Sequence, residues 1–157
     1  MEIKPDWGCD GGIFLRSTEA GQAYQVMLDY LPGGNIGGIY GEGLKGVGPQ
    51  RPANAPRMTP EERAAAARKR NEAWQRVWKR EDWNSIRVRM EGVVPNIKVW
   101  LNGELITDFT DTANHAIDGA ESGMIALQMH FSDENTPRWV DAGFWRWRNI
   151  AIKELPD

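Results

Sequence analysis

Apolar and polar residues alternate with a period of two in several short segments, which is the pattern of half-buried β-strands. Successive side chains of a strand point to opposite faces, so each segment predicts one core-facing side and one outward-facing side. We also expect a short strand at 38–40, inside a loop rich in Gly and Pro. The longer segments are GGIFLRS (11–17), AYQVMLDY (23–30), SIRVRMEG (85–92), IKVWLNGELITDF (97–109), GMIALQMH (123–130) and AGFWRWRNIAIKEL (142–155).

The segment 123–130 raises a question about its second face. Ile125, Leu127 and Met129 share one side, which is apolar and is expected to face the core. Gln128 and His130 share the other side. An amide and an imidazole at these positions either meet solvent or line a ligand site.

Two further local patterns define turns and register. Asn102-Gly103 predicts a hairpin turn, because both residue types tolerate positive φ. In the last segment Trp145 and Trp147 share a side, whereas the isoleucines at 150 and 152 fall on the opposite one. A β-bulge near 148–149 would restore the register of this strand.

One segment, about 60–80, predicts an α-helix instead. Thr59 fits the N-cap, Pro60 the first helical position, and Glu62 the partner of a capping box. Ala67, Trp74 and Trp78 recur at helical spacing, so we expect them to dock this surface helix onto the sheets. The whole pattern predicts one domain over residues 1–157, an all-β sandwich of two antiparallel sheets with one helical insertion.

Composition narrows the class of protein. The 157 residues suit one domain, and a net charge of −3 without a concentrated basic patch argues against nucleic-acid binding. No stretch approaches the roughly 20 apolar residues that cross a bilayer, and no charged-then-apolar leader stands at the start. Cys9 is the one cysteine, so no internal disulfide or multi-cysteine metal site is expected. Eight tryptophans and 17 glycines favour a turn-rich β protein with indole surface.

Six motifs in this order resemble the 3-keto-disaccharide hydrolase family. The resemblance covers nearly the whole chain except the helix at 60–80, and it implies a concanavalin-like jelly roll of two curved antiparallel sheets. It also implies a periplasmic or extracellular location. The motifs are DWGCDGGIFLRS, AYQVMLDY followed by GGIYGEG, DWNSIRVRMEG, IKVWLNGELITDF, GMIALQMH and WRNIAIKEL.

The chain departs from that family in two places. Gln25 stands where the family often has a glutamate, so a carboxylate candidate is an amide here. Family members also carry strands upstream of the segment 11–17, so we expect a domain that lacks its N-terminal strands. An unpaired strand edge would then favour a homo-oligomer or a partner that completes the sheet.

The activity implied by the resemblance is cleavage of a glycoside whose sugar carries a ketone at C3. The ketone acidifies the C2 proton, a base removes it, the enolate expels the group at C1, and water can then add. Such a site needs a base, donors or a metal for the enolate oxygen, and an acid for the leaving group. No cofactor is required, and a divalent metal ion is compatible although no ligand spacing demands one. The alternative is a non-catalytic carbohydrate-binding module on the same fold.

The catalytic candidates are His130, Arg16 and Asp29. Imidazole titrates near neutrality and suits a base. Guanidinium is a donor fork suited to an enolate, although Arg16 could equally form an ion pair with Asp10 or Asp29. Asp29 ends its strand on the polar side, where it could act as a base, bind a sugar hydroxyl or pair with Arg16. His130 could also be merely solvated.

The substrate-binding candidates are polar or aromatic residues that point away from the predicted core. If their strands belong to one sheet, they form a mixed aromatic and amide face of the kind that binds carbohydrate. The alternative is an ordinary solvated surface. They are Gln25, Tyr40, Glu42, Lys98, Trp100 and Gln128.

Overall fold

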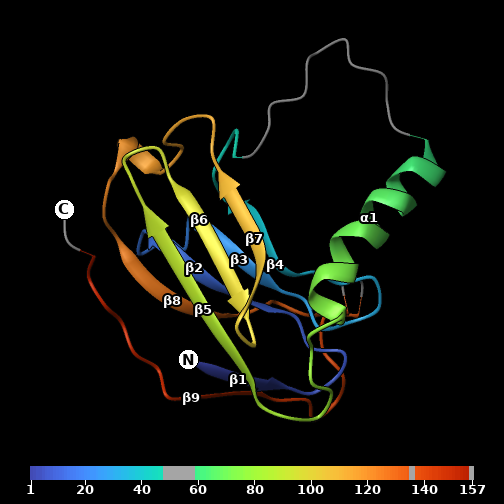
Figure 1. The fold of residues 1–157 in the computed structure, drawn as a ribbon. Helices are drawn as coiled ribbons and strands as arrows, with labels where there is room; N and C mark the ends of the chain where they lie inside the picture. Colours follow the sequence, from blue (N-terminus) through green and yellow to red (C-terminus); the bar gives the residue numbers. More distant parts are fainter. Residues whose placement is uncertain (48–58, 135–136, 156–157) are drawn as a thin grey trace.

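The computed structural model describes residues 1–47, 59–134 and 137–155. Within them the chain forms two antiparallel sheets that pack face to face (Figure 1), which confirms the predicted all-β sandwich. One sheet has the order β4-β3-β2-β8, and the other has the order β7-β6-β5-β1-β9. The strands are β1 (Glu2–Pro5), β2 (Gly11–Ser17), β3 (Ala23–Leu28), β4 (Ile36–Glu42), β5 (Asn84–Glu91), β6 (Asn96–Leu101), β7 (Glu104–Thr110), β8 (Met124–Met129) and β9 (Trp145–Arg148).

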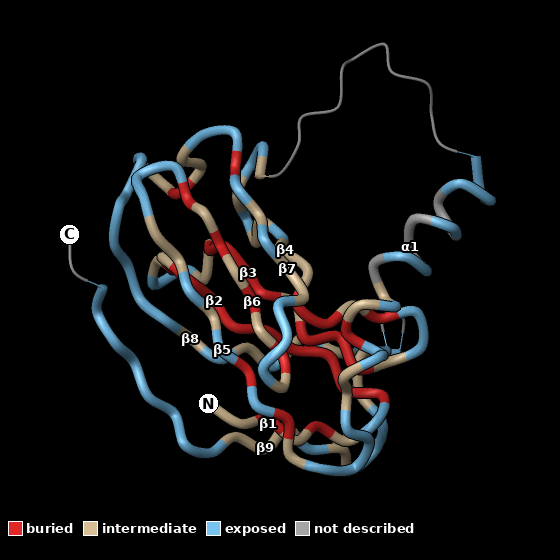
Figure 2. The backbone as a smooth tube through the Cα atoms, in the orientation of Figure 1, coloured by how far each residue is buried: buried red, intermediate tan, exposed pale blue. Residues whose placement is uncertain are grey.

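The core lies between the two sheets, where Figure 2 shows buried residues along the central strands. Ile13 and Val26 come from the four-stranded sheet, and Val99 and Leu101 come from the five-stranded one; none is more than 1% exposed. Their alternation with less buried neighbours along β6 matches the period of two in the sequence. The β6–β7 hairpin turns at Asn102-Gly103, both with positive φ, as predicted.

The helix α1 (Pro60–Gln75) begins with the predicted capping box, in which Thr59 and Glu62 each bond the other's backbone N–H. It projects from the sandwich and contacts it through its C-terminal end (Figure 1). There Trp74 is buried, and Trp74 and Trp78 both pack against Tyr30. The predicted contact of Ala67 lies outside the described side chains. No helix of the described residues is long and apolar enough to span a membrane.

The apolar side of β8 differs from the prediction that it lies in the core. Ile125, Leu127 and Met129 are 47%, 39% and 72% exposed. The physical reason is position, because β8 is an edge strand that pairs only with β2 among the described strands. The strand opposite this edge is short, since β9 ends at Arg148 and residues 149–155 continue without strand pairing.

Two more details of the strands correct the sequence analysis. The predicted bulge near Arg148 is absent from the described strand, which simply ends where Asn149 adopts a positive φ of 51°. Ile150 beyond it is half exposed rather than returned to the core. The strand β1 was not predicted; its four residues pair with β5 and β9 and so join the N-terminus to the sheet.

Candidate functional site

One row of side chains crosses the four-stranded sheet at the end of β2. The register of β2 with β3 continues through the Cys9–Tyr30 bridge, which places Asp10 opposite Asp29. The register of β2 with β8 places Asp10 opposite His130, whose N–H lies 3.4 Å from the Asp10 carbonyl oxygen. Directly opposed residues share a face. Asp29, Asp10 and His130 therefore stand side by side on the face turned away from the core.

The two aspartates of this row form a buried carboxyl pair. Asp10 is 3% exposed and Asp29 is 8% exposed. Burial, together with a hydrogen bond from Asp29 to the nearby Asp10 carboxylate, raises the pKa of Asp29 to about 8. Arg138 lies 3.4 Å from the Asp10 carboxylate and balances its charge. At neutral pH this arrangement keeps Asp29 protonated beside the Asp10 carboxylate.

The ring of His130 has a defined orientation at the open end of the row. Its Nδ1 lies 2.6 Å from the carbonyl oxygen of Phe131. A carbonyl can only accept a hydrogen bond, so Nδ1 carries the proton and the neutral ring keeps its lone pair on Nε2. The Trp139 indole donates to the His130 carbonyl over 2.8 Å and holds the backbone there. The imidazole therefore presents a basic nitrogen beside the carboxyl pair.

Two amides meet one step further along the same face. Gln25 Nε2 donates to Gln128 Oε1 over 2.8 Å, although β2 lies between their strands. This is possible because Gly12 separates them, and a Cβ there would lie 2.6 Å from Gln25 Nε2. Gln25 is 4% exposed, so its environment is far drier than that of a surface amide. The Gln128 Nε2 group has no hydrogen-bond partner among the described residues.

Two other predicted substrate-binding residues lie on the next strand of this sheet. Tyr40 pairs in register with Gln25, and Glu42 pairs with Ala23, so both share the outward face. Tyr40 is 53% exposed. The structure therefore brings six predicted site residues to one face of one sheet: Gln25, Asp29, Tyr40, Glu42, Gln128 and His130.

Arg16 does not join them. The register between β2 and β8 shifts between Phe14 and Ser17, and Arg16 adopts a positive φ of 49°. Its guanidinium donates to the carbonyls of Gly92 and Val93, in the turn after β5 of the other sheet. The expectation that Arg16 faces the ligand is therefore corrected: it ties the two sheets together.

Lys98 and Trp100 are also separated from the site. Both lie on β6, where Val99 between them is fully buried, so they occupy the outer face of the opposite sheet. Lys98 pairs with Asp108 over 3.3 Å, and the Arg87 guanidinium lies 3.8 Å from the centre of the Trp100 ring. The sequence pattern identified them correctly as outward-facing, but it could not assign them to a sheet.

The second histidine, His115, is held elsewhere in a polar cluster. Its Nδ1 lies 2.8 Å from an Asp111 carboxylate oxygen, and that oxygen also accepts from the Tyr24 hydroxyl at 3.0 Å. Burial raises the pKa of Tyr24 to about 12. This cluster ties the loop after β7 to β3, and it gives a histidine against which the role of His130 can be compared.

Asp10, Arg138 and Trp139 are the site residues that sequence reasoning missed. Asp10 precedes its strand and was considered only as a partner for Arg16, whereas its register places it between Asp29 and His130. Arg138 lies in a polar loop without periodicity, so no local pattern identifies it. Among the described residues, no three His, Cys, Asp or Glu side chains form a group that could hold a metal ion.

Comparison with known proteins identifies the family. No curated protein matches the chain. The model of the family described as 3-keto-alpha-glucoside-1,2-lyase-like domains matches residues 1–153, nearly the whole sequence. That match agrees with the six motifs and the sandwich, and it points to a role in acting on carbohydrate. The chain belongs to the 3-keto-alpha-glucoside-1,2-lyase-like domain family.

Proposed function

We propose that this protein cleaves 3-keto-glycosides by removing the proton at C2. Family membership supports a carbohydrate substrate. The observation that carries the proposal is the row of Asp29, Asp10 and His130, because it combines a basic nitrogen with a carboxyl that keeps its proton near neutral pH. An elimination needs both functions, and it does not need the two carboxylates that flank the bond in ordinary glycosidases.

In the proposed first step, His130 Nε2 takes the C2 proton, and the electrons of that bond form an enolate across C2 and C3. The enolate then re-forms the C3 ketone and a C1–C2 double bond while the C1–O bond breaks. Asp29 is the proposed acid that delivers a proton to the departing oxygen. The products are the free alcohol and an unsaturated 3-keto sugar, and addition of water at C1 would complete a net hydrolysis.

The amide pair is proposed to bind the C3 oxygen. Gln128 Nε2 has two N–H donors without partners among the described residues, and Gln25 fixes its orientation through the 2.8 Å hydrogen bond. Donors fixed in place before reaction stabilise a developing oxyanion without further reorganisation. Glu42 and Tyr40, on the adjacent strand, would then contact the sugar hydroxyls and ring.

The test is turnover of a 3-keto-glycoside such as 3-keto-trehalose, followed by release of the keto sugar or of the unsaturated product. We expect His130→Ala to lose at least 100-fold in kcat, the usual contribution of a general base. His115→Ala is the matched control, because that ring belongs to the structural cluster with Asp111. Equal turnover by His130→Ala and the wild type would overturn the proposal.

The turnover assay also tests whether the reaction needs a cofactor. We propose that no cofactor is required, so turnover should survive dialysis against a chelator. Loss of turnover would indicate that a divalent ion participates.

We also propose a periplasmic or extracellular location, as the family resemblance implies. Fractionation of the producing cells tests this location directly.

The second candidate is a carbohydrate-binding module without catalysis. A partial domain completed by a partner chain is a further alternative, because β8 leaves apolar side chains exposed. Gln25 favours the module, because an amide cannot serve as an acid or a base where the family often has a carboxylate. Binding of the keto sugar without turnover would favour this alternative. Light scattering tests the partner chain, since a stable monomer would count against it.

A further inference from the structure

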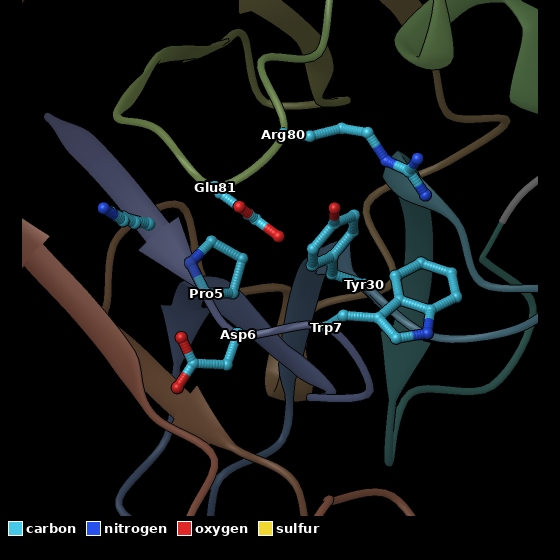
Figure 3. A pocket seen from close by; sticks show the side chains of 7 residues that line it. Pro5, Asp6, Trp7, Tyr30, Arg80 and Glu81 are labelled. Carbon is cyan, nitrogen blue, oxygen red and sulfur yellow. The ribbon is translucent and has the colours of Figure 1, made fainter.

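A cavity of about 820 Å³ opens at the end of the sandwich near the C-terminal end of α1. It is lined by residues 4–7 at the end of β1 and just beyond it, by Tyr30 after β3, and by Arg80 and Glu81 between α1 and β5 (Figure 3). This volume lies within the range of small-molecule sites. Its wall includes a segment from the helical insertion, so it is not simply the gap between two sheets.

A rigid aromatic wall forms one side of the cavity. Trp7 is 49% exposed, and its ring packs edge-on against Tyr30 at 4.8 Å. Tyr30 in turn packs against Trp78 at 4.8 Å and against the buried Trp74. The Gly8 N–H donates to the Tyr30 carbonyl over 2.7 Å, which fixes the chain beside Trp7. An exposed indole is therefore held in place before any ligand arrives.

Three of the four charged side chains around this wall form no hydrogen bond or ion pair within the described part of the chain. Arg80, Glu81 and Lys4 make no hydrogen bond or ion pair there, nor does the Tyr30 hydroxyl. Asp6 is different, because Arg146 and the Phe144 N–H already occupy its carboxylate. Figure 3 shows the Glu81 carboxylate pointing between Pro5 and Tyr30, with the Arg80 guanidinium beyond the Tyr30 ring.

These features define the ligand chemistry. The indole offers an apolar face, the guanidinium a fixed donor fork, and the carboxylate an acceptor. Charges of both signs lie together, so a strongly anionic or cationic ligand would meet a like charge. A neutral polyhydroxylated ring satisfies all three groups at once, because its C–H face covers the indole and its hydroxyls both donate and accept.

We propose that this cavity is a second saccharide-binding site, which takes unoxidised sugar units and is separate from the Asp29–Asp10–His130 row. Tyr30 and Asp29 are consecutive residues, but Tyr30 packs with the core, whereas Asp29 lies on the outward face. The two sites thus use opposite sides of the same sheet end. A sugar bound in the cavity does not need a C3 ketone, so its binding can be measured without any reaction.

The test is a titration with maltose and cellobiose, followed through the NMR signals of the backbone N–H groups at positions 6–8, which all the variants retain. We expect a saturable shift with a millimolar dissociation constant, the range for a small, solvent-exposed contact. Trp7→Ala should weaken binding at least tenfold, and Arg80→Met and Glu81→Gln should each weaken it several-fold. Trp83→Ala is the matched control, because that indole is covered by the Arg148 guanidinium outside the cavity.

The outcomes separate this proposal from the proposed function. Turnover of a 3-keto-glycoside by Trp7→Ala should stay within threefold of the wild type, whether or not sugar binding is lost. No saturable shift, or a shift that persists in Trp7→Ala, would overturn the second site. Preferential binding of glucuronate or of a short peptide would also overturn it. If Trp7→Ala fails to fold, Arg80→Met and Glu81→Gln on exposed side chains still decide the question.

Discussion

Gln25 and Gln128 meet above Gly12, with Gln25 Nε2 donating to Gln128 Oε1 over 2.8 Å across an intervening strand. A Cβ at position 12 would come within 2.9 Å of both amides. The absence of a side chain there is therefore what allows the two strands to present one joined amide pair. Gln25 takes part in the outward face of the sheet through that contact.

Gly12→Ala should separate the amides and cost about 1–3 kcal/mol in the free energy of unfolding, the range for leaving buried polar groups unpaired. Urea unfolding of Gly12→Ala, Gln25→Ala and the double variant forms a cycle. If the glycine acts through the amide pair, the second substitution costs less in the presence of the first. Additive losses would show that Gly12 matters for another reason.

Asp29→Asn should change how stability depends on pH. The pKa of Asp29 is raised from 3.8 to about 8, mainly by burial and by the neighbouring Asp10. The folded protein thus holds a proton that the unfolded chain releases, so this contribution is complete below about pH 4 and is lost as pH rises toward 8. Asparagine mimics the protonated carboxyl, so the variant should keep its stability where the wild type loses it.

Unfolding free energies of the two proteins at pH 5 and pH 8.5 check this expectation. The advantage of Asp29→Asn should grow between these values, while Glu121→Gln, on an exposed carboxyl, serves as the control. Parallel pH profiles for Asp29→Asn and the wild type would contradict a protonated Asp29. Turnover of the same variant then reports separately on its proposed role as the acid.

Arg16→Ala should lower stability and leave turnover nearly unchanged. The guanidinium bonds the carbonyls of Gly92 and Val93 at 2.7 and 3.1 Å, so its loss should cost about 1–2 kcal/mol, reduced by its exposure. Arg16→Gly is a useful comparison, because glycine also relieves the positive φ at this position. A loss of turnover as large as that of His130→Ala would restore Arg16 to the catalytic set.

Trp100→Ala should likewise leave turnover intact, because β6 carries this side chain on the outer face of the opposite sheet. Its stacking with Arg87 predicts a stability loss of about 0.5–1 kcal/mol, the value for an exposed cation–π contact. Thermal unfolding and the turnover assay measure the two effects. Loss of sugar cleavage in Trp100→Ala would mean that the site extends to both faces of the sandwich.

Local patterns in the sequence predicted the elements well, because their causes are local. The positive φ values at Asn102-Gly103 and the reciprocal hydrogen bonds of Thr59 and Glu62 follow from residues close together in the chain. The outward faces of β3 and β8 follow from alternation alone, and so Gln25 and His130 were correctly expected to point away from the core.

Long-range pairing accounts for what the sequence could not predict. Asp10 joins Asp29 and His130 only through the register of three strands, of which β8 is distant in sequence from β2 and β3. Arg16 leaves the site face because β2 shifts register after Phe14, a change that no residue pattern marks. Lys98 faces outward as expected, but alternation does not say to which sheet a strand belongs.

Alternation also does not show that β8 lies at the edge of its sheet, and this edge position gives a final prediction. Leu28 is fully buried, so Leu28→Ala should cost about 2–5 kcal/mol in unfolding free energy. Leu127 is 39% exposed on the edge strand, so Leu127→Ala should cost less than about 1.5 kcal/mol, since little apolar surface is returned to water. Chemical denaturation of both variants at two protein concentrations measures the difference. A loss at Leu127 equal to that at Leu28 and dependent on concentration would mean that a second chain covers β8 in solution.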